Sequence, residues 1–333
     1  MRFGPVAPAE AEGAILAHSV PLAKGRLRKG RRITAADCDA LTKAGHAEVW
    51  VARPEAGDVP EDEAAARLAA ALVPDPQAVG LRIGGAGTGR VNLHADRRGV
   101  LCYSAEAIHA LNGADPGLTF ALLEPVARVR EGQLVGTVKM IPYAVPGDAL
   151  ATAEAAARDA SLLVRQASIE RATLIETEVL GIAAGAKGER AVRGRVEALG
   201  AAMDPVVRTR HRVDDIAAAI AASDAGLVLI LTASATSDPH DVAPEAVRRA
   251  GGRLIRFGMP VDPGNLLFVG EHGGRPVIGL PGCARSPALN GADWVLDRIL
   301  TGLPCGFGEI ARMGVGGLLK EIPARGLPRE PIA

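Results

Sequence analysis

The feature that most constrains this fold is a regular alternation of strand-like and helix-like segments between residues 171 and 303. The run Leu227–Leu231 is apolar at every position, as in a strand buried on both faces of a parallel sheet. Val192, Val196 and Leu199 lie at helical spacing and predict a covering helix. The expected strands are 172–179, 205–211, 227–231, 253–257, 266–269 and 276–280, and the expected helices are 187–199, 213–220, 242–250 and 286–300. This order predicts an α/β class: a three-layer αβα domain with a mainly parallel sheet.

The rest of the chain is expected to be organised differently. Short strands dominate residues 76–148, so a smaller α+β accessory domain is predicted there, with residues 96–99 as a hairpin turn. The glycine-rich residues 84–89 predict a flexible connection, because no lysine completes a P-loop and no crossover helix follows. The predicted segments are 1–75 (amino-terminal), 76–148 (accessory), 149–170 (linker helix), 171–305 (α/β) and 306–333 (tail rich in Gly and Pro).

Composition excludes several classes of function. Lys and Arg together number 38, as do Asp and Glu, and no basic stripe is interleaved with aromatics, so no nucleic-acid binding is expected. No apolar run approaches the roughly 20 residues of a membrane span, and the start lacks the pattern of a signal peptide. Four widely spaced cysteines form no C-x-x-C pair, so neither a disulfide framework nor a metal site is expected. A cytoplasmic protein is predicted.

Two loops of the α/β region attract attention, because ligands in open α/β sheets bind beyond the carboxyl ends of the strands. Residues 232–241 carry four hydroxyls and two carboxylates, which suit a phosphate or a polar ring beside a helix start. The alternative is that Asp241 only caps the next helix. In residues 280–286, Arg285 either meets an anion or is solvated, and Ser286 is expected to cap a helix with Pro287 at its first position.

Four segments, taken in order, resemble the molybdopterin-binding domain shared by the molybdopterin molybdenumtransferases and their adenylyltransferase relatives. Residues 231–242 (LTASATSDPHDV) are similar to T-G-G-V-S-V-G-x-x-D-V, and residues 251–257 (GGRLIRF) follow at the expected distance. Residues 261–266 (VDPGNL) are similar to K-P-G-K-P, and residues 279–286 (GLPGCARS) to G-L-P-G-N-P-V-S. Residues 27–37 also resemble part of the transferases' amino-terminal region.

The resemblance implies binding of molybdopterin, a pterin-dithiolene phosphate, or of the assembled molybdenum cofactor. If the chain is a transferase, the resemblance also implies a catalytic role for Asp241 and a Mg ion. Molybdoenzymes or other cofactor-synthesis proteins are the implied partners, and a homo-oligomer would match the family. The residues implied to line the site are Glu178, Thr232, Ser234, Thr236, Ser237, Asp241, Pro281, Gly282 and Ser286.

The chain also departs from the family pattern. Asp262 and Asn265 stand where the family has lysines, and Thr177 stands where it has an acid. Ala233 and Ser234 replace glycines, and the segment N-S-A-M-D-G-Y-A has no counterpart. Three hypotheses follow: a molybdopterin-binding protein of cofactor biosynthesis or delivery; a molybdenumtransferase that inserts molybdate into adenylylated molybdopterin; and a relative that hydrolyses a nucleotide pyrophosphate.

Overall fold

The computed structural model describes residues 1–179 and 186–319. The chain divides into two compact units: residues 1–97 with 101–165 form the first, and residues 98–100 with those from 166 onward form the second. About 32% of the structure is helical and 29% is strand, so the α/β class predicted from the sequence is consistent with the content. No helix among the described residues is long and apolar enough to cross a membrane.

The first unit begins with a small antiparallel sheet in the order β1-β5-β2. Helix α1 starts at Thr34, whose hydroxyl accepts from the Asp37 N–H while the Asp37 carboxylate accepts from the Thr34 N–H. This capping box satisfies two N–H groups that the helix leaves unpaired, and Leu41 on α1 packs into the core beneath the sheet. The elements are β1 (Arg2–Val6), η1 (Pro8–Glu10), β2 (Ile15–Leu16), β3 (Val20–Pro21), β4 (Arg26–Leu27), α1 (Ala35–Lys43) and β5 (Val49–Arg53).

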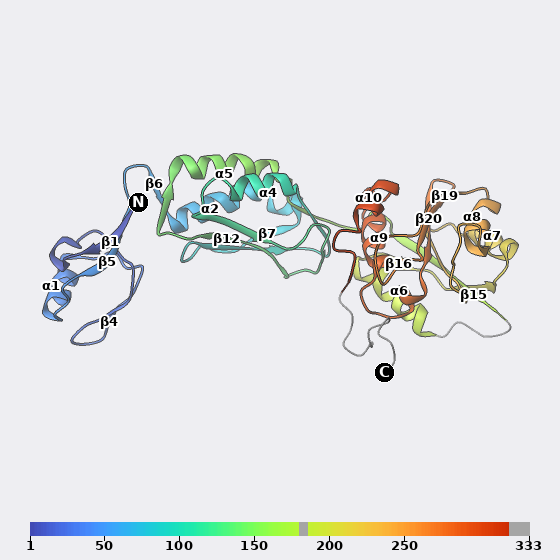
Figure 1. The fold of residues 1–333 in the computed structure, drawn as a ribbon, viewed down its shortest axis with the longest axis horizontal. Coiled ribbons are helices and arrows are strands. Elements are labelled where there is room, and N and C mark those ends of the chain that lie inside the picture. The colour runs from blue at the N-terminus through green and yellow to red at the C-terminus, as the bar shows by residue number, and fades with distance from the viewer. Residues whose placement is uncertain (180–185, 320–333) are drawn as a thin grey trace, which may run out of the picture. The chain divides into compact units, whose positions relative to one another are not determined.

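The remainder of the first unit packs its longer helices on two sheets, an antiparallel one in the order β10-β12-β8-β7 and another in the order β11-β9-β14 (Figure 1). The alanine-rich helix α5 packs against α2 and α4, and its Leu150 and Ala153 are fully buried. The elements are β6 (Asp58–Pro60), α2 (Glu61–Leu72), α3 (Pro76–Val79), β7 (Leu81–Ile83), β8 (Arg90–Ala95), β9 (Gly99–Cys102), α4 (Ala105–Asn112), β10 (Leu118–Leu122), β11 (Arg128–Val129), β12 (Leu134–Met140), β13 (Ala144–Pro146), α5 (Gly147–Asp159) and β14 (Leu163–Arg165).

One prediction for this part was wrong. Residues 96–99 do not join a hairpin, since β8 pairs with β7 and β12 while β9 belongs to the other sheet. Residues 84–89 connect β7 to β8 as the turn of a hairpin, in which Gly87 and Arg90 exchange backbone hydrogen bonds. Short strands of similar composition can pair in several ways, and burial of their side chains decides among them.

The second unit is built on a seven-stranded sheet with the main order β16-β15-β18-β21-β20-β19, in which β17 also pairs with β15. Strand β15 runs parallel to β16, β17 and β18, and β18 runs parallel to β21. The β21–β20 and β20–β19 pairs are antiparallel, so the sheet is mixed. The elements are β15 (Arg171–Glu178), α6 (Ala186–Ala198), β16 (Ala202–Met203), β17 (Val207–Arg210), α7 (Val213–Ala222), β18 (Leu227–Leu231), α8 (Val242–Arg249), β19 (Arg253–Phe257), β20 (Phe268–His272), β21 (Arg275–Leu280), η2 (Gly282–Arg285), α9 (Gly291–Leu300) and α10 (Phe307–Arg312).

Helices pack on this sheet from both sides (Figure 1). Ile230 of β18 belongs to a core cluster with residues of α7 and α8. Its neighbour Leu231 points to the other face, where α6 lies so close that a Cβ at Gly188 would be 3.1 Å from the Leu231 side chain. All five residues of β18 are buried, which confirms the prediction for this strand.

The predicted start of the last long helix was wrong. Ser286 does not cap a helix: it ends the short η2 helix, and α9 begins at Gly291. Asn290 is the true N-cap and forms a capping box with Asp293. Reciprocal capping of this kind satisfies two backbone donors at once, whereas the Ser286 hydroxyl accepts only the Ala288 N–H, at 3.3 Å. Asn290 therefore sets the start of the helix.

Candidate functional site

The loops predicted to hold a ligand lie at one edge of the second unit's sheet. Strands β15, β18 and β21 are adjacent and parallel, so their carboxyl ends meet at the same edge. Glu178 ends β15, Thr232 follows β18 and Pro281 follows β21. The Arg285 guanidinium donates to the Thr232 carbonyl over 2.6 Å and so ties the two loops together. The Arg285 side chain is therefore bonded to the protein backbone and is not simply solvated.

Three threonines at this edge are buried and bonded within the protein. The Thr177 hydroxyl accepts from the Ala233 N–H at 2.8 Å and lies 3.0 Å from the His211 Nδ1. The Thr232 hydroxyl donates to the Ser234 carbonyl at 2.5 Å and lies 3.4 Å from the Thr236 hydroxyl. These residues shape the loop, and the hydroxyl-bearing side chains that the loop exposes to solvent are those of Ser234 and Ser237.

The Asp241 carboxylate is committed to the backbone. Its Oδ1 accepts from the Val242 N–H at 2.7 Å, and its Oδ2 accepts from the Ser237 N–H at 3.1 Å. The first bond caps α8, and the second fixes the return of the loop. Both oxygens therefore have a structural task, as the capping alternative requires.

A buried acid that the sequence analysis did not select lies beneath these loops. Glu176 is fully buried in β15, and neither carboxylate oxygen has a hydrogen-bond partner among the described residues. The Arg208 guanidinium lies 3.7 Å from Glu176 Oε2. Burial raises the pKa of Glu176 despite the opposing effects of Arg208 and Arg285. The signal was available: Glu176 shares the period of Ala172 and Leu174, an acid in an apolar alternation.

Arg195, which holds the loop that begins at residue 280, was also missed by the sequence analysis. Its guanidinium is buried and donates to Asp293 Oδ1 at 2.8 Å and to the carbonyls of Ala284 and Ser286 at 2.8 and 2.7 Å. It also donates to the carbonyl of Ala288 at 2.9 Å. The helical spacing could have revealed it, because Arg195 lies on the same face of α6 as the buried Val192 and Val196.

The segment resembling K-P-G-K-P lies against the start of α9. The Gly291 N–H donates to the Pro263 carbonyl at 2.8 Å. Gly264 has φ +139, and a Cβ there would lie 2.6 Å from the Gly291 nitrogen. Only glycine permits this approach. Within residues 1–179 and 186–319, no group of three or more His, Cys, Asp or Glu side chains is placed to hold a metal ion.

Comparison with known proteins gives limited results. Residues 5–53 match the model of a domain of unknown function, DUF8806. No curated protein sequence matches the chain significantly. A structure described as the molybdopterin biosynthesis moea protein from Pyrococcus horikosii aligns at 14% identity and TM-score 0.31, over 90% of this chain and 75% of that one. A molybdenum cofactor biosynthesis protein from Pyrococcus furiosus aligns at 15% identity and TM-score 0.25, over 63% and 69%. Scores this low bear on neither the fold nor the function.

Proposed function

We propose that the second unit is a three-layer αβα molybdopterin-binding domain, and that the protein binds molybdopterin or the molybdenum cofactor during cofactor biosynthesis or delivery. The observation that carries the proposal is the meeting of two family-like loops at one sheet edge, joined by the hydrogen bond from Arg285 to the Thr232 carbonyl. The loops come from segments that resemble the family in the same order along the chain.

The exposed residues at this sheet edge offer hydroxyl groups and accessible backbone to a polar, anionic ligand. Ser234 and Ser237 are exposed, so their hydroxyls can donate to phosphate or pterin oxygens. Gly282 is also exposed, and a Cβ there would meet no atom within 4 Å, so the backbone is open to a ligand. Molybdopterin, when bound, would supply the dithiolene sulfurs that carry molybdenum; the chain's own part is to hold the pterin phosphate.

The state of Asp241 favours binding over metal insertion. In the transferase hypothesis Asp241 handles molybdate, but both of its oxygens accept backbone N–H groups. The family lysines that would add positive charge are replaced by Asp262 and Asn265. We therefore propose a binding function without turnover.

The test is a binding titration followed by a single-turnover assay. The full chain is titrated with molybdopterin and with adenylylated molybdopterin, and molybdate is then added. We expect binding without metal transfer. Ser234→Asp should weaken binding about tenfold or more, because it sets a negative charge against an anion. Thr152→Asp, at an exposed hydroxyl on α5, is the matched control and should leave affinity unchanged. Failure of both forms to bind would exclude the proposal.

Asp241→Asn separates the binding hypothesis from the transferase hypothesis. Asparagine keeps the bond that caps α8 but loses the acceptor for the Ser237 N–H, so the negative charge is removed at a cost of only about 0.5–1.5 kcal/mol in stability. If the wild-type chain transfers molybdenum and Asp241→Asn does not, Asp241 takes part in the transfer reaction and the transferase hypothesis is correct. The binding proposal expects no transfer by either protein and similar affinities for both.

A further inference from the structure

A pocket in the first unit lies outside the site described above. It has a volume of about 490 Å³, within the roughly 300–1,000 Å³ range of small-molecule sites. Apolar side chains form much of its wall, and charged groups are few. Such a lining is typical of sites that bury a ring and orient it with a small number of polar contacts.

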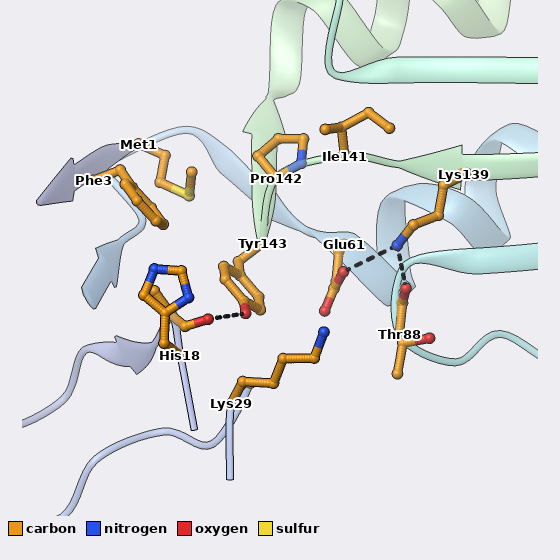
Figure 2. Close-up of a pocket in the computed structure, with 12 residues that line it drawn as sticks. Met1, Phe3, His18, Lys29, Glu61, Thr88, Lys139, Ile141, Pro142 and Tyr143 are labelled. Atoms are coloured by element: carbon orange, nitrogen blue, oxygen red, sulfur yellow. Dashed lines mark hydrogen bonds and ion pairs between the residues drawn. The ribbon is translucent and has the colours of Figure 1, made fainter. Parts of the chain in front are cut away.

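One end of the pocket carries positive charge. Lys29 and Lys139 point toward Glu61 from two sides (Figure 2). The Lys139 ammonium donates to the Thr88 carbonyl at 2.5 Å but lies 3.9 Å from Glu61 Oε2, beyond hydrogen-bond range. Among the described residues, the Lys29 ammonium has no hydrogen-bond or ion-pair partner, and its side chain is exposed. The two lysines share one carboxylate: Lys139 forms a long ion pair with Glu61, and Lys29 interacts with it electrostatically.

The other end is aromatic. Phe3, His18 and Tyr143 lie together there (Figure 2). The centroids of the Phe3 and His18 rings are 6.5 Å apart, and the Tyr143 hydroxyl donates a hydrogen bond to the Ala17 carbonyl at 3.1 Å. Phe3 is 51% exposed and Ile141 63% exposed, so large apolar side chains that line the pocket remain in contact with water. A planar ring would cover them.

The glycine-rich stretch enters the same pocket. Thr88, with φ 53, follows the exposed residues 85–87 and precedes Gly89, whose N–H donates to Asp62 Oδ1 at 2.6 Å. The β7–β8 turn therefore presents Thr88 beside Lys139, whose ammonium its carbonyl accepts, so the turn helps to gather the two ammonium groups at one end. Lysines and hydroxyls donate readily to phosphate oxygens.

We propose that this pocket binds a phosphate monoester carrying a planar ring, of the mononucleotide class, with the phosphate at Lys29 and Lys139 and the ring against Phe3 and His18. The excess of two ammonium groups over one carboxylate selects an anion, and the aromatic end selects a ring. Burial raises the pKa of Glu61, so a ligand group that donates a hydrogen bond to this carboxyl would meet an incompletely solvated acceptor. The site is separate from the one proposed for molybdopterin.

Calorimetric titration of the full chain with AMP, GMP, adenosine and ribose 5-phosphate tests the proposal. We expect AMP and GMP to bind. Adenosine, which lacks the phosphate, and ribose 5-phosphate, which lacks the ring, should each bind at least about tenfold more weakly. Ribose 5-phosphate binding as tightly as AMP would overturn the role of the ring, and absence of nucleotide binding would overturn the proposal as a whole.

Variants locate the binding. Lys29→Met should lower AMP affinity about tenfold or more, and because Lys29 is exposed the fold should be retained. Phe3→Ala should lower it about fivefold to 150-fold if the ring stacks on Phe3. Lys24→Met, an exposed lysine of the same region that does not line the pocket, is the matched control. Unchanged affinity in Lys29→Met would refute the site. Asp241→Asn should leave AMP binding unchanged, which separates this proposal from the preceding one.

Discussion

Arg195 should contribute more to the stability of the second unit than any exposed arginine on the same helix. Its side chain is 5% exposed, its ion pair with Asp293 spans 2.8 Å, and its other donors reach the carbonyls of residues 284, 286 and 288. Removing one partner of a buried, hydrogen-bonded pair typically costs about 3–5 kcal/mol. Arg195→Met keeps most of the volume and removes the charge. We expect a loss of about 3–5 kcal/mol in the free energy of unfolding, or a fall in Tm of about 6–20 °C.

The assay can be confined to this unit. The chain has two tryptophans, Trp50 in the first unit and Trp294 on α9. In a Trp50→Phe background, urea denaturation followed by fluorescence reports α9, next to the loop that Arg195 holds. Arg193→Met is the matched control: its side chain is 31% exposed, and its pairs with Glu189 and Glu197 should be worth about 1 kcal/mol or less each, as should its hydrogen bond to the Met203 carbonyl. A loss below about 1 kcal/mol in Arg195→Met, or equal losses in the two variants, would refute the reasoning.

Further predictions concern the acid, a glycine and a thiol of this unit. Burial raises the pKa of Glu176 in the folded protein, so the contribution of its protonated form to stability is complete below about pH 4.5 and is lost as the pH rises through the folded pKa. Relative to the wild type, Glu176→Gln should therefore gain stability as the pH rises from about 4 to about 8, as measured by paired denaturation curves. Gly264→Ala should cost about 1–3 kcal/mol because of its φ and its approach to α9, whereas Gly194→Ala, on the exposed face of α6 with open space around it, should stabilise by about 0.5–1 kcal/mol; equal effects would contradict this. Burial raises the pKa of Cys305 to about 11 from 9.0, so iodoacetamide at pH 8 should modify it about a hundredfold more slowly than in urea, as followed by mass spectrometry.

The sequence predicted those parts of the protein that depend on local pattern. A run of five apolar residues can only be a buried strand or a buried helix segment, and its length and flanks favoured the strand seen as β18. Thr34 and Ser104 are residue types favoured at the N-cap, and each caps the helix that follows it. Both polar loops were predicted to follow the carboxyl ends of strands in a mainly parallel sheet, and the structure adds that these strands, β18 and β21, are neighbours. The limits of the five predicted segments, the ligand and the cytoplasmic location stay predictions.

Tertiary structure decided what local pattern left open. Ser286 and Pro287 have a favourable start for a helix, yet α9 begins at Gly291, since Asn290 and Asp293 cap each other. The carbonyls of Ser286 and Ala288 are instead held by Arg195, some 90 residues earlier in the chain. The partners of β8 depended likewise on which faces became buried. At the predicted ligand site, sequence supplied the loops and their hydroxyls, but only the fold showed that Asp241 is bound to backbone N–H groups and that Arg285 joins the loops. Contacts between residues distant in sequence depend on burial and on three-dimensional approach, which no local spacing encodes.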